Sequence, residues 1–241
     1  MTESSFSQHP PVQKQNRKAD WRLSSHVEIR LLWAGIVIFA SCIFLIGYAD
    51  PSIATYVKTV DLRIYRFFRV ITSLGYSAIY LIPFGILCII LRLLSYIPVF
   101  QPKKRIVMKV YYSFLFIFSS IAISGVITDI FKFLFGRTRP TLLFKDNYYD
   151  FAFFEFSSEM LSFPSGHANT IFALATALFF LLPKGWLLYF SVAVLVGASR
   201  VFTGSHYPSD VIAGSYLAVL TTLYIKQYFV FKKIDIFERP R

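Results

Sequence analysis

The sequence predicts an all-α, polytopic membrane protein, and its apolar content, its few charges and the spacing of those charges all indicate this fold class. The 241 residues are 56% apolar, with a mean hydropathy of +0.56. Charged residues make up 16% of the chain, whereas soluble domains have about 25%. The charges separate six long apolar runs, the pattern of a protein with six transmembrane helices. Six spans and their loops use nearly the whole length, so we expect one domain.

The six runs differ in length, and the difference points to particular polar residues. The first three runs approach the roughly 20 residues that cross a bilayer as a helix, and the last three are shorter. Each short run is bounded on its outer side by a polar residue, namely His167, Arg200 or Asp210. We expect their helices to continue past these residues and to place them just below the membrane surface, facing the bundle interior. The runs cover residues 31–49, 70–91, 110–128, 168–183, 185–199 and 211–225.

The distribution of Lys and Arg predicts the orientation. With a cytoplasmic N-terminus, most Lys and Arg residues fall in cytoplasmic segments, in agreement with the positive-inside rule. Both termini are then cytoplasmic, and the motifs described below lie at the outer membrane interface. We divide the chain into a polar cytoplasmic tail at 1–29, a six-span domain at 30–231 with its motifs in 132–210, and a basic cytoplasmic tail at 232–241.

Two features near the N-terminus leave alternatives open. Gly47-Tyr48-Ala49, at the end of the first run, resembles a signal-peptide cleavage site, but the polar stretch before the run favours a retained first span. Residues 50–69 alternate apolar and basic side chains. That alternation fits a helix lying in the outer interface and fits an ordinary packed loop helix equally well.

The charge and the cysteines exclude several partners. A net charge of +12 would favour nucleic-acid binding in a soluble protein, but cytoplasmic loops and a phosphate site explain most of it here, so no nucleic acid is expected. Cys42 and Cys88 lie in separate apolar runs without metal-ligand spacing, and we predict lipid- or core-facing thiols. No cluster of Asp and Glu in the sequence offers oxygen ligands for Mg²⁺, so no metal and no other cofactor is predicted.

A first polar cluster follows the third run. Lys132 and Arg139-Pro140 supply two cations to one stretch. Arg binds two phosphate oxygens through its planar guanidinium, whereas Lys acts as a point charge. The simpler interpretation of this cluster alone is a set of membrane-flanking cations that extend to the lipid headgroups, and Arg137 is compatible with that interpretation.

A second cluster, Pro164-Ser165-Gly166-His167, opens the fourth run. A helix N-terminus offers free N–H groups and a positive dipole end to an anion. Gly166 lets the backbone approach closely, and Ser165 adds a hydroxyl donor. His167 can protonate a leaving alkoxide, because its ordinary pKa lies near neutrality. A simple helix cap is the alternative for this cluster on its own.

A third cluster, with Ser199-Arg200, His206 and Asp210, joins the fifth and sixth runs. His206 and Asp210 are one helical turn apart, so they can form a hydrogen bond. A carboxylate on one imidazole nitrogen fixes the tautomer and leaves the other nitrogen free to attack. This pair alone fits a structural role, but the three clusters together contain the cations, proton donor and nucleophile of metal-free phosphoryl transfer.

In order and spacing, the clusters resemble the type 2 phosphatidic acid phosphatase superfamily, whose signature reads Lys-x6-Arg-Pro, Pro-Ser-Gly-His and Ser-Arg-x5-His-x3-Asp. All of its fixed positions are present, and the resemblance covers residues 70–231 approximately. It implies that His206 is a nucleophile that forms a phosphohistidine, that Asp210 orients it, and that His167 protonates the leaving group. It also implies a reaction without a metal, with phosphate held by Lys132, Arg139, Ser165, Gly166 and Arg200.

The sequence thus predicts a lipid phosphatase of the bacterial inner membrane with its site facing the periplasm. The expected substrate is a phosphorylated membrane lipid, with lipid A phosphate, undecaprenyl (pyro)phosphate and phosphatidylglycerol phosphate as candidates and lipid A weakly favoured. A lipid phosphotransferase and an anion or lipid-phosphate transporter are the alternatives. The aromatic loop at 141–163 is expected to form a lid over a large lipid headgroup. The oligomeric state stays open.

Overall fold

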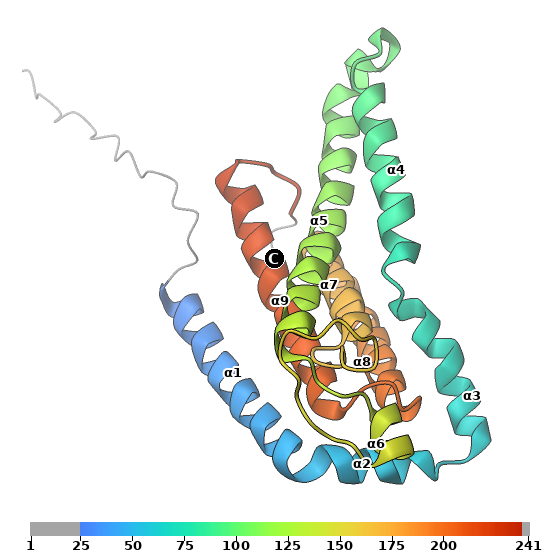
Figure 1. Ribbon diagram of the computed structural model, residues 1–241. Helices are drawn as coiled ribbons and strands as arrows, with labels where there is room; N and C mark the ends of the chain where they lie inside the picture. Colours follow the sequence, from blue (N-terminus) through green and yellow to red (C-terminus); the bar gives the residue numbers. More distant parts are fainter. Residues whose placement is uncertain (1–24, 238–241) are drawn as a thin grey trace, which may run out of the picture.

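The computed structural model describes residues 25–237 and is all-α over that range, as predicted (Figure 1). No β-strand occurs within these residues, although Arg137 and Phe151 form an isolated bridge. Four helical segments are long and apolar enough to cross a membrane, and a fifth apolar helix, Gly166–Leu181, is shorter. The four segments are His26–Lys58, Leu62–Leu94, Pro98–Phe135 and Pro183–Phe202.

The helices follow one another through short turns, except for a longer loop between α6 and α7. In chain order, the main elements are α1 (Ser25–Phe44), a π-helical turn (Leu45–Ala49), α2 (Asp50–Lys58), α3 (Leu62–Ile71), a 3-10 turn (Thr72–Gly75), α4 (Ala78–Leu94), α5 (Lys104–Phe135), α6 (Pro140–Asp146), α7 (Gly166–Leu181), α8 (Trp186–Phe202) and α9 (Pro208–Phe231). Further 3-10 turns precede α5 and α8.

The observed helices differ from the apolar runs at several points. α1 begins at Ser25, so the end of the predicted tail at 1–29 is helical, while residues 1–24 lie outside the described range. α5 and α9 extend beyond their runs, because a charged side chain ends an apolar run without ending a helix. The run at 70–91 is not one helix. It is broken between α3 and α4 where Gly75 lies against His167, since a Cβ on Gly75 would be 2.7 Å from that side chain.

α7 lies at the centre of the bundle and packs against α5, α8 and α9. α4 packs against α5, α1 against α9, and α3 against α8. Figure 1 shows α2 and α6 at one end of the bundle and the connection between α4 and α5 at the other. The C-terminal end of α5 and the N-terminal ends of α7 and α9 all lie toward the α2 end, which therefore brings the three sequence clusters together.

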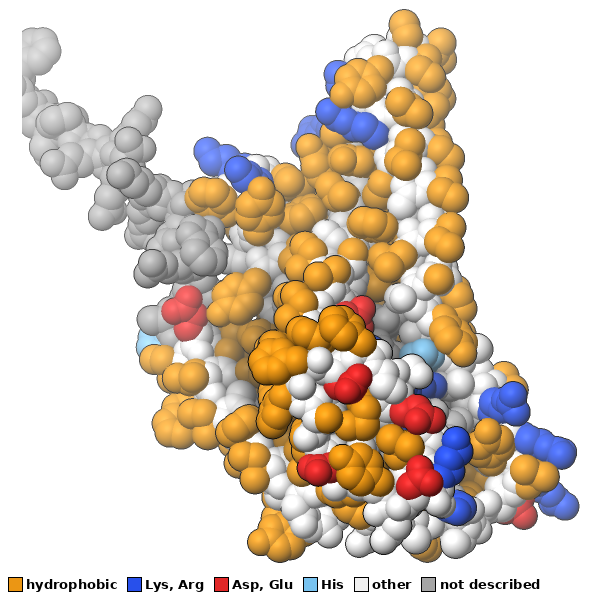
Figure 2. Space-filling view, in the orientation of Figure 1, with side chains coloured by type: hydrophobic (Ala, Val, Ile, Leu, Met, Phe, Trp, Pro, Cys, Tyr) orange, Lys and Arg blue, Asp and Glu red, His pale blue; other side chains and the backbone are white. Residues whose placement is uncertain are grey.

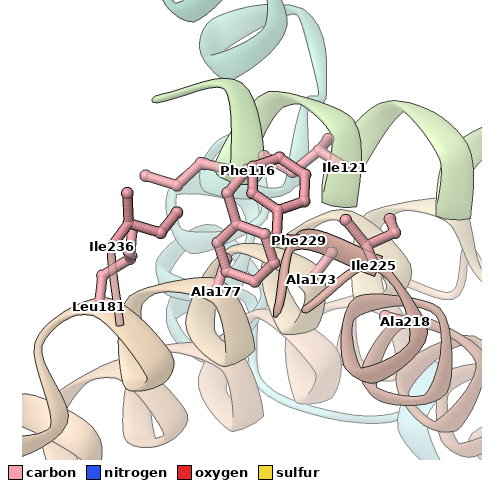
Figure 3. Packing of buried hydrophobic residues seen from close by; sticks show 10 residues of the cluster. Phe116, Ile121, Ala173, Ala177, Leu181, Ala218, Ile225, Phe229 and Ile236 are labelled. Atoms are coloured by element: carbon pink, nitrogen blue, oxygen red, sulfur yellow. The ribbon is translucent and has the colours of Figure 1, made fainter. Parts of the chain in front are cut away.

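The apolar core lies between α5, α7 and α9 (Figure 3). The rings of Phe116 and Phe229 meet edge to face with their centroids 5.4 Å apart. Ala173 and Ala177 of α7 are fully buried beside them, and such small residues let helices approach closely. Ile236, which follows α9, is buried in the same cluster. This core fixes the relative positions of the helices that supply the site.

α1 and α4 leave most of their apolar side chains exposed. In the most apolar stretch of each segment, His26–Lys58 and Leu62–Leu94, 6% of the residues are buried. Figure 2 shows hydrophobic side chains covering the outer side of α4. An exposed apolar surface of this extent is unusual on a soluble monomer. On a membrane protein it is the surface that contacts the lipid chains.

Candidate active site

The C-terminal end of α5 positions Lys132. Gly136 has a φ of 53°, and its N–H donates to the Lys132 carbonyl at 2.9 Å, which ends the helix. A Cβ on Gly136 would lie 1.6 Å from the carbonyl oxygen of Ala152, so both the backbone angle and the space require glycine. The Lys132 ammonium contacts Asp129 at 3.0 Å. It also faces Gly166, where a Cβ would be 3.0 Å from Nζ.

The Arg139 side chain is held by backbone carbonyls from two loops. Its Nε donates to Ser158 at 2.7 Å, and its Nη groups reach Leu161 at 3.3 Å and Ser205 at 3.5 Å. Burial lowers the pKa of Arg139 from its ordinary value, while the Asp210 carboxylate raises it. The group stays charged near neutral pH. One guanidinium thus ties the loop before α7 to the loop before α9.

The second cluster lies where α7 begins, against the start of α9. The Ser165 N–H donates to the Asp210 carbonyl at 2.9 Å. Gly214 allows this approach, because a Cβ there would be 2.4 Å from the Ser165 carbonyl oxygen. The His167 ring packs edge-on against Tyr76 at a centroid distance of 4.6 Å. The Ser165 hydroxyl and the His167 Nε2 are buried without a hydrogen-bond partner among residues 25–237.

Arg200 lies in the last turn of α8 and is buried. Its Nη1 donates to the Thr72 hydroxyl at 2.6 Å. Its Nε is buried and finds no partner in the described part of the chain. The N–H groups of Ser205 and His206 both donate to the Arg200 carbonyl, at 3.0 and 3.1 Å. This turn brings His206 back beside the end of α8.

His206 and Asp210 lie together, as their spacing predicted. The His206 Nδ1 is 3.4 Å from the Asp210 Oδ2 and 3.4 Å from the Ser162 hydroxyl. The same Oδ2 accepts from Ser162 at 2.6 Å and from the Tyr207 N–H at 2.9 Å. Asp210 therefore caps α9 while it contacts the imidazole. Because Nδ1 faces the carboxylate, Nε2 is the ring nitrogen that points away from it.

The electrostatic surroundings keep His206 neutral. Burial lowers the pKa of His206 to about 4, and although Asp210 opposes this change, Arg139 and Arg200 add to it. The imidazole is therefore uncharged near neutral pH. A neutral imidazole keeps the lone pair that a nucleophile requires.

A cavity of about 440 Å³ opens between α4, α5 and α7. Lys132, Gly166 and His167 line one part of it, and apolar residues such as Leu81 and Ile121 line another. Figure 2 shows a hollow between the α4 and α5 sides of the molecule. The volume is within the range of about 300–1,000 Å³ that is usual for small-molecule sites. The cavity therefore connects the polar cluster with the apolar surface of the bundle.

All eight residues named from the sequence lie in this region. His167 is within electrostatic reach of Lys132, Arg139, Arg200 and His206. Ser165 and Asp210 are joined through their backbones, and Gly166 faces Lys132. Three fixed cations, a helix N-terminus and two histidines thus lie close together, with Lys132, Gly166 and His167 lining the cavity, and such a set suits an anion with several oxygens.

The structure contradicts the interpretation of Arg137 as a membrane-flanking cation. Its side chain is 0% exposed and forms ion pairs with Asp50 and Asp210, which are also fully buried. Burial lowers the pKa of Arg137, but the Asp210 carboxylate, Tyr149 and Asp50 raise it by more, so that the pKa lies above its ordinary value. Asp50, Ser162 and Tyr149 were not predicted as site residues, because nothing in their spacing relates them to the motifs.

The loop after Arg139 divides its aromatic residues between two environments. Tyr149 is partly buried and contacts Arg137. Phe153, Phe154 and Phe156 are exposed, although the last two also contact Phe133 of α5. Two of the exposed rings thus lie against the residue that follows Lys132, and the role of this loop as a lid stays a prediction.

Comparison with known proteins identifies the family. Residues 113–234, just over half of the chain, match the family model described as the PAP2 superfamily. The match contains all three clusters. The chain therefore belongs to the PAP2 superfamily.

Individual relatives match a shorter part of the chain. The lipid A 1-phosphatase of Rhizobium etli is 36% identical over 104 residues, which cover 41% of this chain and 43% of the relative. An undecaprenyl-diphosphatase of Sulfolobus acidocaldarius is 36% identical over 96 residues, which cover 39% and 45%, respectively. The chain thus spans less than half the length of these curated relatives.

A solved structure matches over a larger part. It is the crystal structure of a transmembrane PAP2-type phosphatidylglycerolphosphate phosphatase from Bacillus subtilis, with a TM-score of 0.57 and 22% sequence identity. The match covers 84% of this chain and 98% of that chain. The two proteins therefore share a fold.

Proposed function

We propose that this chain is a lipid phosphatase of the bacterial inner membrane that acts through a phosphohistidine at His206. The observation that carries the proposal is a group of unsatisfied buried polar atoms in the three clusters, one of them on His167, which lines the cavity. Ser165 Oγ, His167 Nε2 and Arg200 Nε are buried without hydrogen-bond partners among the described residues. Buried polar groups are normally paired, and leaving one unpaired costs about 1–3 kcal/mol. A phosphoryl group, with its several oxygens, would satisfy these atoms together.

The first step would transfer the phosphoryl group to the protein. The His206 Nε2 lone pair attacks phosphorus, a P–N bond forms and the bond from phosphorus to the lipid oxygen breaks. The negative charge of the bound phosphate favours a protonated His167, which then gives its proton to the departing oxygen. The imidazole gains positive charge, which the Asp210 carboxylate at Nδ1 stabilises. Lys132, Arg139 and Arg200 balance the negative charge on the phosphoryl oxygens.

The second step would release inorganic phosphate. His167, now neutral, accepts a proton from a water molecule as the water oxygen attacks phosphorus. The P–N bond breaks, and His206 returns to its neutral form. No metal takes part in this scheme, because side-chain cations supply the charge stabilisation.

The cavity favours a substrate with a phosphate joined to an apolar chain. Lys132 and His167 lie at its polar part, and Leu81 and Ile121 line its apolar part. Relatives named lipid A 1-phosphatase and undecaprenyl-diphosphatase support the same class. The candidate substrates are therefore lipid A phosphate, undecaprenyl (pyro)phosphate and phosphatidylglycerol phosphate.

We also infer the position of the chain in the membrane. α7 and α9 complete a set of six spans with α1, α4, α5 and α8, and both termini lie in the cytoplasm. The three clusters then lie at the periplasmic face. This orientation rests on the distribution of Lys and Arg. A cysteine-accessibility assay on intact cells, with single cysteines at exposed Asp61 and Asp235, would label the former from outside and the latter only after permeabilisation.

The same site admits a second reaction. A phosphotransferase would pass the phosphoryl group from His206 to a lipid hydroxyl in place of water, and the apolar wall of the cavity would also accept such a lipid. A transporter of anions or lipid phosphates would need the cations but not the attacking nitrogen. Product analysis separates the three.

The test is phosphate release by the purified full chain in detergent containing EDTA, with the three candidate lipids and phosphatidic acid. The His206→Ala variant is compared with His26→Ala, a matched change at an exposed histidine of α1. We expect activity in the wild type and in His26→Ala. We expect a loss on the order of 10⁴-fold or more in His206→Ala, as for other removed nucleophiles.

Each other outcome contradicts one part of the proposal. Transfer to a lipid hydroxyl that exceeds phosphate release would favour the phosphotransferase. Activity that survives in His206→Ala would exclude the phosphohistidine. Loss of activity in EDTA that added metal restores would contradict the metal-free scheme.

A further inference from the structure

Arg137 is a buried cation that joins the catalytic carboxylate to a part of the chain outside the family match. One terminal nitrogen, Nη1, donates to Asp210 Oδ1 at 2.5 Å and to the Ser209 hydroxyl at 2.7 Å. The other, Nη2, donates to Asp50 Oδ2 at 2.8 Å and to the Tyr149 hydroxyl at 2.6 Å. Asp50 lies before residue 113, where the family match begins.

Asp50 and Asp210 are linked a second time through Ser209. The Ser209 hydroxyl donates to Asp50 Oδ2, and the Ser209 N–H donates to Asp50 Oδ1 at 3.3 Å. Asp50, Arg137, Ser209 and Asp210 are all 0% exposed. The N-terminus of α9, which carries the catalytic carboxylate, is therefore fixed against α2 by direct hydrogen bonds.

The sequence around Asp50 explains how α2 reaches this position. The Asp50 N–H donates to Leu45, five residues back, in the π-helical turn. The Ile46 carbonyl would ordinarily accept from the N–H of Asp50 or of the next residue. The Asp50 N–H already donates to Leu45, and Pro51 has no N–H. The Ile46 carbonyl accepts instead from the Tyr149 hydroxyl at 2.8 Å. Tyr149 thereby connects this turn to Arg137, and π-helical turns often occur at functional sites.

The charges in this network decide how much of the Asp210 charge acts on His206. Arg137 carries one positive charge and is shared by two carboxylates. Because Asp50 balances Arg137, Asp210 keeps its negative charge for the imidazole, which it contacts through the other oxygen, Oδ2. Without Asp50, Asp210 would be the only carboxylate among residues 25–237 that pairs with the buried guanidinium. A nearby cation reduces the stabilisation of a positive imidazole.

We propose that Asp50 and Arg137 are positioning residues for the catalytic pair, with Arg137 orienting Asp210 toward His206 and Asp50 balancing the charge of Arg137. The inference rests on the proposed phosphohistidine reaction. Neither residue lines the cavity, so both act through Asp210. The active unit thus includes α2 in addition to the segment that the family match covers.

The test compares Asp50→Asn with Asp61→Asn in the purified full chain. Both changes remove one acidic charge at a helix N-terminus, but Asp61 is exposed and caps α3 through the Arg63 N–H, a role that Asn also performs. We expect kcat to fall about 10- to 100-fold in Asp50→Asn, the range that is usual for an outer residue that orients a functional side chain through a hydrogen bond. KM should stay close to the wild-type value, since the phosphate-binding groups are unchanged. Asp61→Asn should behave as wild type.

A second readout follows His206 directly. NMR of histidine-labelled protein, with the resonance assigned by its absence in His206→Ala, gives the pKa of His206 without substrate. Asp50→Asn should lower that pKa, because it removes a negative charge from the network. The other charged or titratable groups that face His206 are Asp210, Arg139, Arg200 and His167, and they are the same in both variants.

The outcomes separate this inference from the proposed function. Wild type without phosphatase activity would contradict the proposed function, and the His206 titration would still decide the inference. If Asp50→Asn matches wild type in both kcat per folded molecule and the pKa of His206, the inference is overturned and Asp50 has a structural role. If Asp50→Asn does not fold, Tyr149→Phe removes one acceptor of Arg137. It should lower kcat about 2- to 10-fold, and an unchanged kcat would overturn the inference.

Discussion

The N-terminal helices α1 to α4 and the bundle of α5, α7, α8 and α9 are built differently. In the apolar stretches of the first two segments, 6% of the residues are buried, against 33% in Pro98–Phe135 and 28% in Pro183–Phe202. The N-terminal part thus contributes little to the core. It nevertheless reaches the site through two buried polar side chains, Asp50 and Thr72. A region can therefore be peripheral for packing and still be close to the chemistry.

The largest effect that would sharpen this comparison is expected within the bundle, at His167. We expect His167→Ala to lower kcat about 10²- to 10⁴-fold on a lipid phosphate, the usual contribution of a general acid. The fall in kcat should be much smaller on an aryl phosphate, because its leaving group needs no proton. The measurement is kcat on both substrates. Equal losses on the two would contradict the role of His167 as proton donor.

The next effect compares a glycine from each region. Gly136→Ala should destabilise the protein by more than about 2 kcal/mol, since φ is 53° and the new Cβ would meet the Ala152 carbonyl. Gly47→Ala is the matched change in the N-terminal part, where nothing lies within 4 Å of the new Cβ. Thermal unfolding in detergent measures both. A similar Tm for the two variants would show that the bundle does not depend on this turn.

The smallest effect concerns the contact between Thr72 and Arg200. Thr72→Val keeps the shape but removes the acceptor of a 2.6 Å hydrogen bond. The loss of about 1 kcal/mol should raise KM, or the inhibition constant of inorganic phosphate, about 3- to 10-fold with little change in kcat. Thr55→Val, at an exposed threonine of α2 whose hydroxyl bonds within its own helix, should have no effect. Identical constants for both variants would confine phosphate binding to the bundle.

The sequence predicted the features that follow from local patterns. Uncharged runs indicated the helices, and the spacing of His206 and Asp210 indicated a contact that the structure contains. The three clusters were expected to meet because each lies at the outer end of a predicted span. These inferences need only periodicity, charge and the length of a helix that crosses a bilayer.

Other features could not be predicted from one sequence. Asp50 and Arg137 are 87 positions apart, and Ser162 and Asp210 are 48 apart, so packing and not spacing brings them together. The break between α3 and α4 was missed because an uncharged Gly75 does not interrupt an apolar run. The reason for a glycine there is a tertiary contact with His167, which the sequence does not show. The extension of α9 past residue 225 was missed because Lys226 ended the run, although this side chain lies over the Phe180 ring at 4.1 Å.

The cavity between α4 and α5 has a consequence for how a substrate would be encountered. A lipid that enters through this opening never leaves the membrane, so it reaches the protein by diffusion in two dimensions. The quantity that sets its rate of capture is then its mole fraction in the bilayer or micelle. Adding inert detergent at a constant lipid concentration would slow turnover, and adding buffer would not.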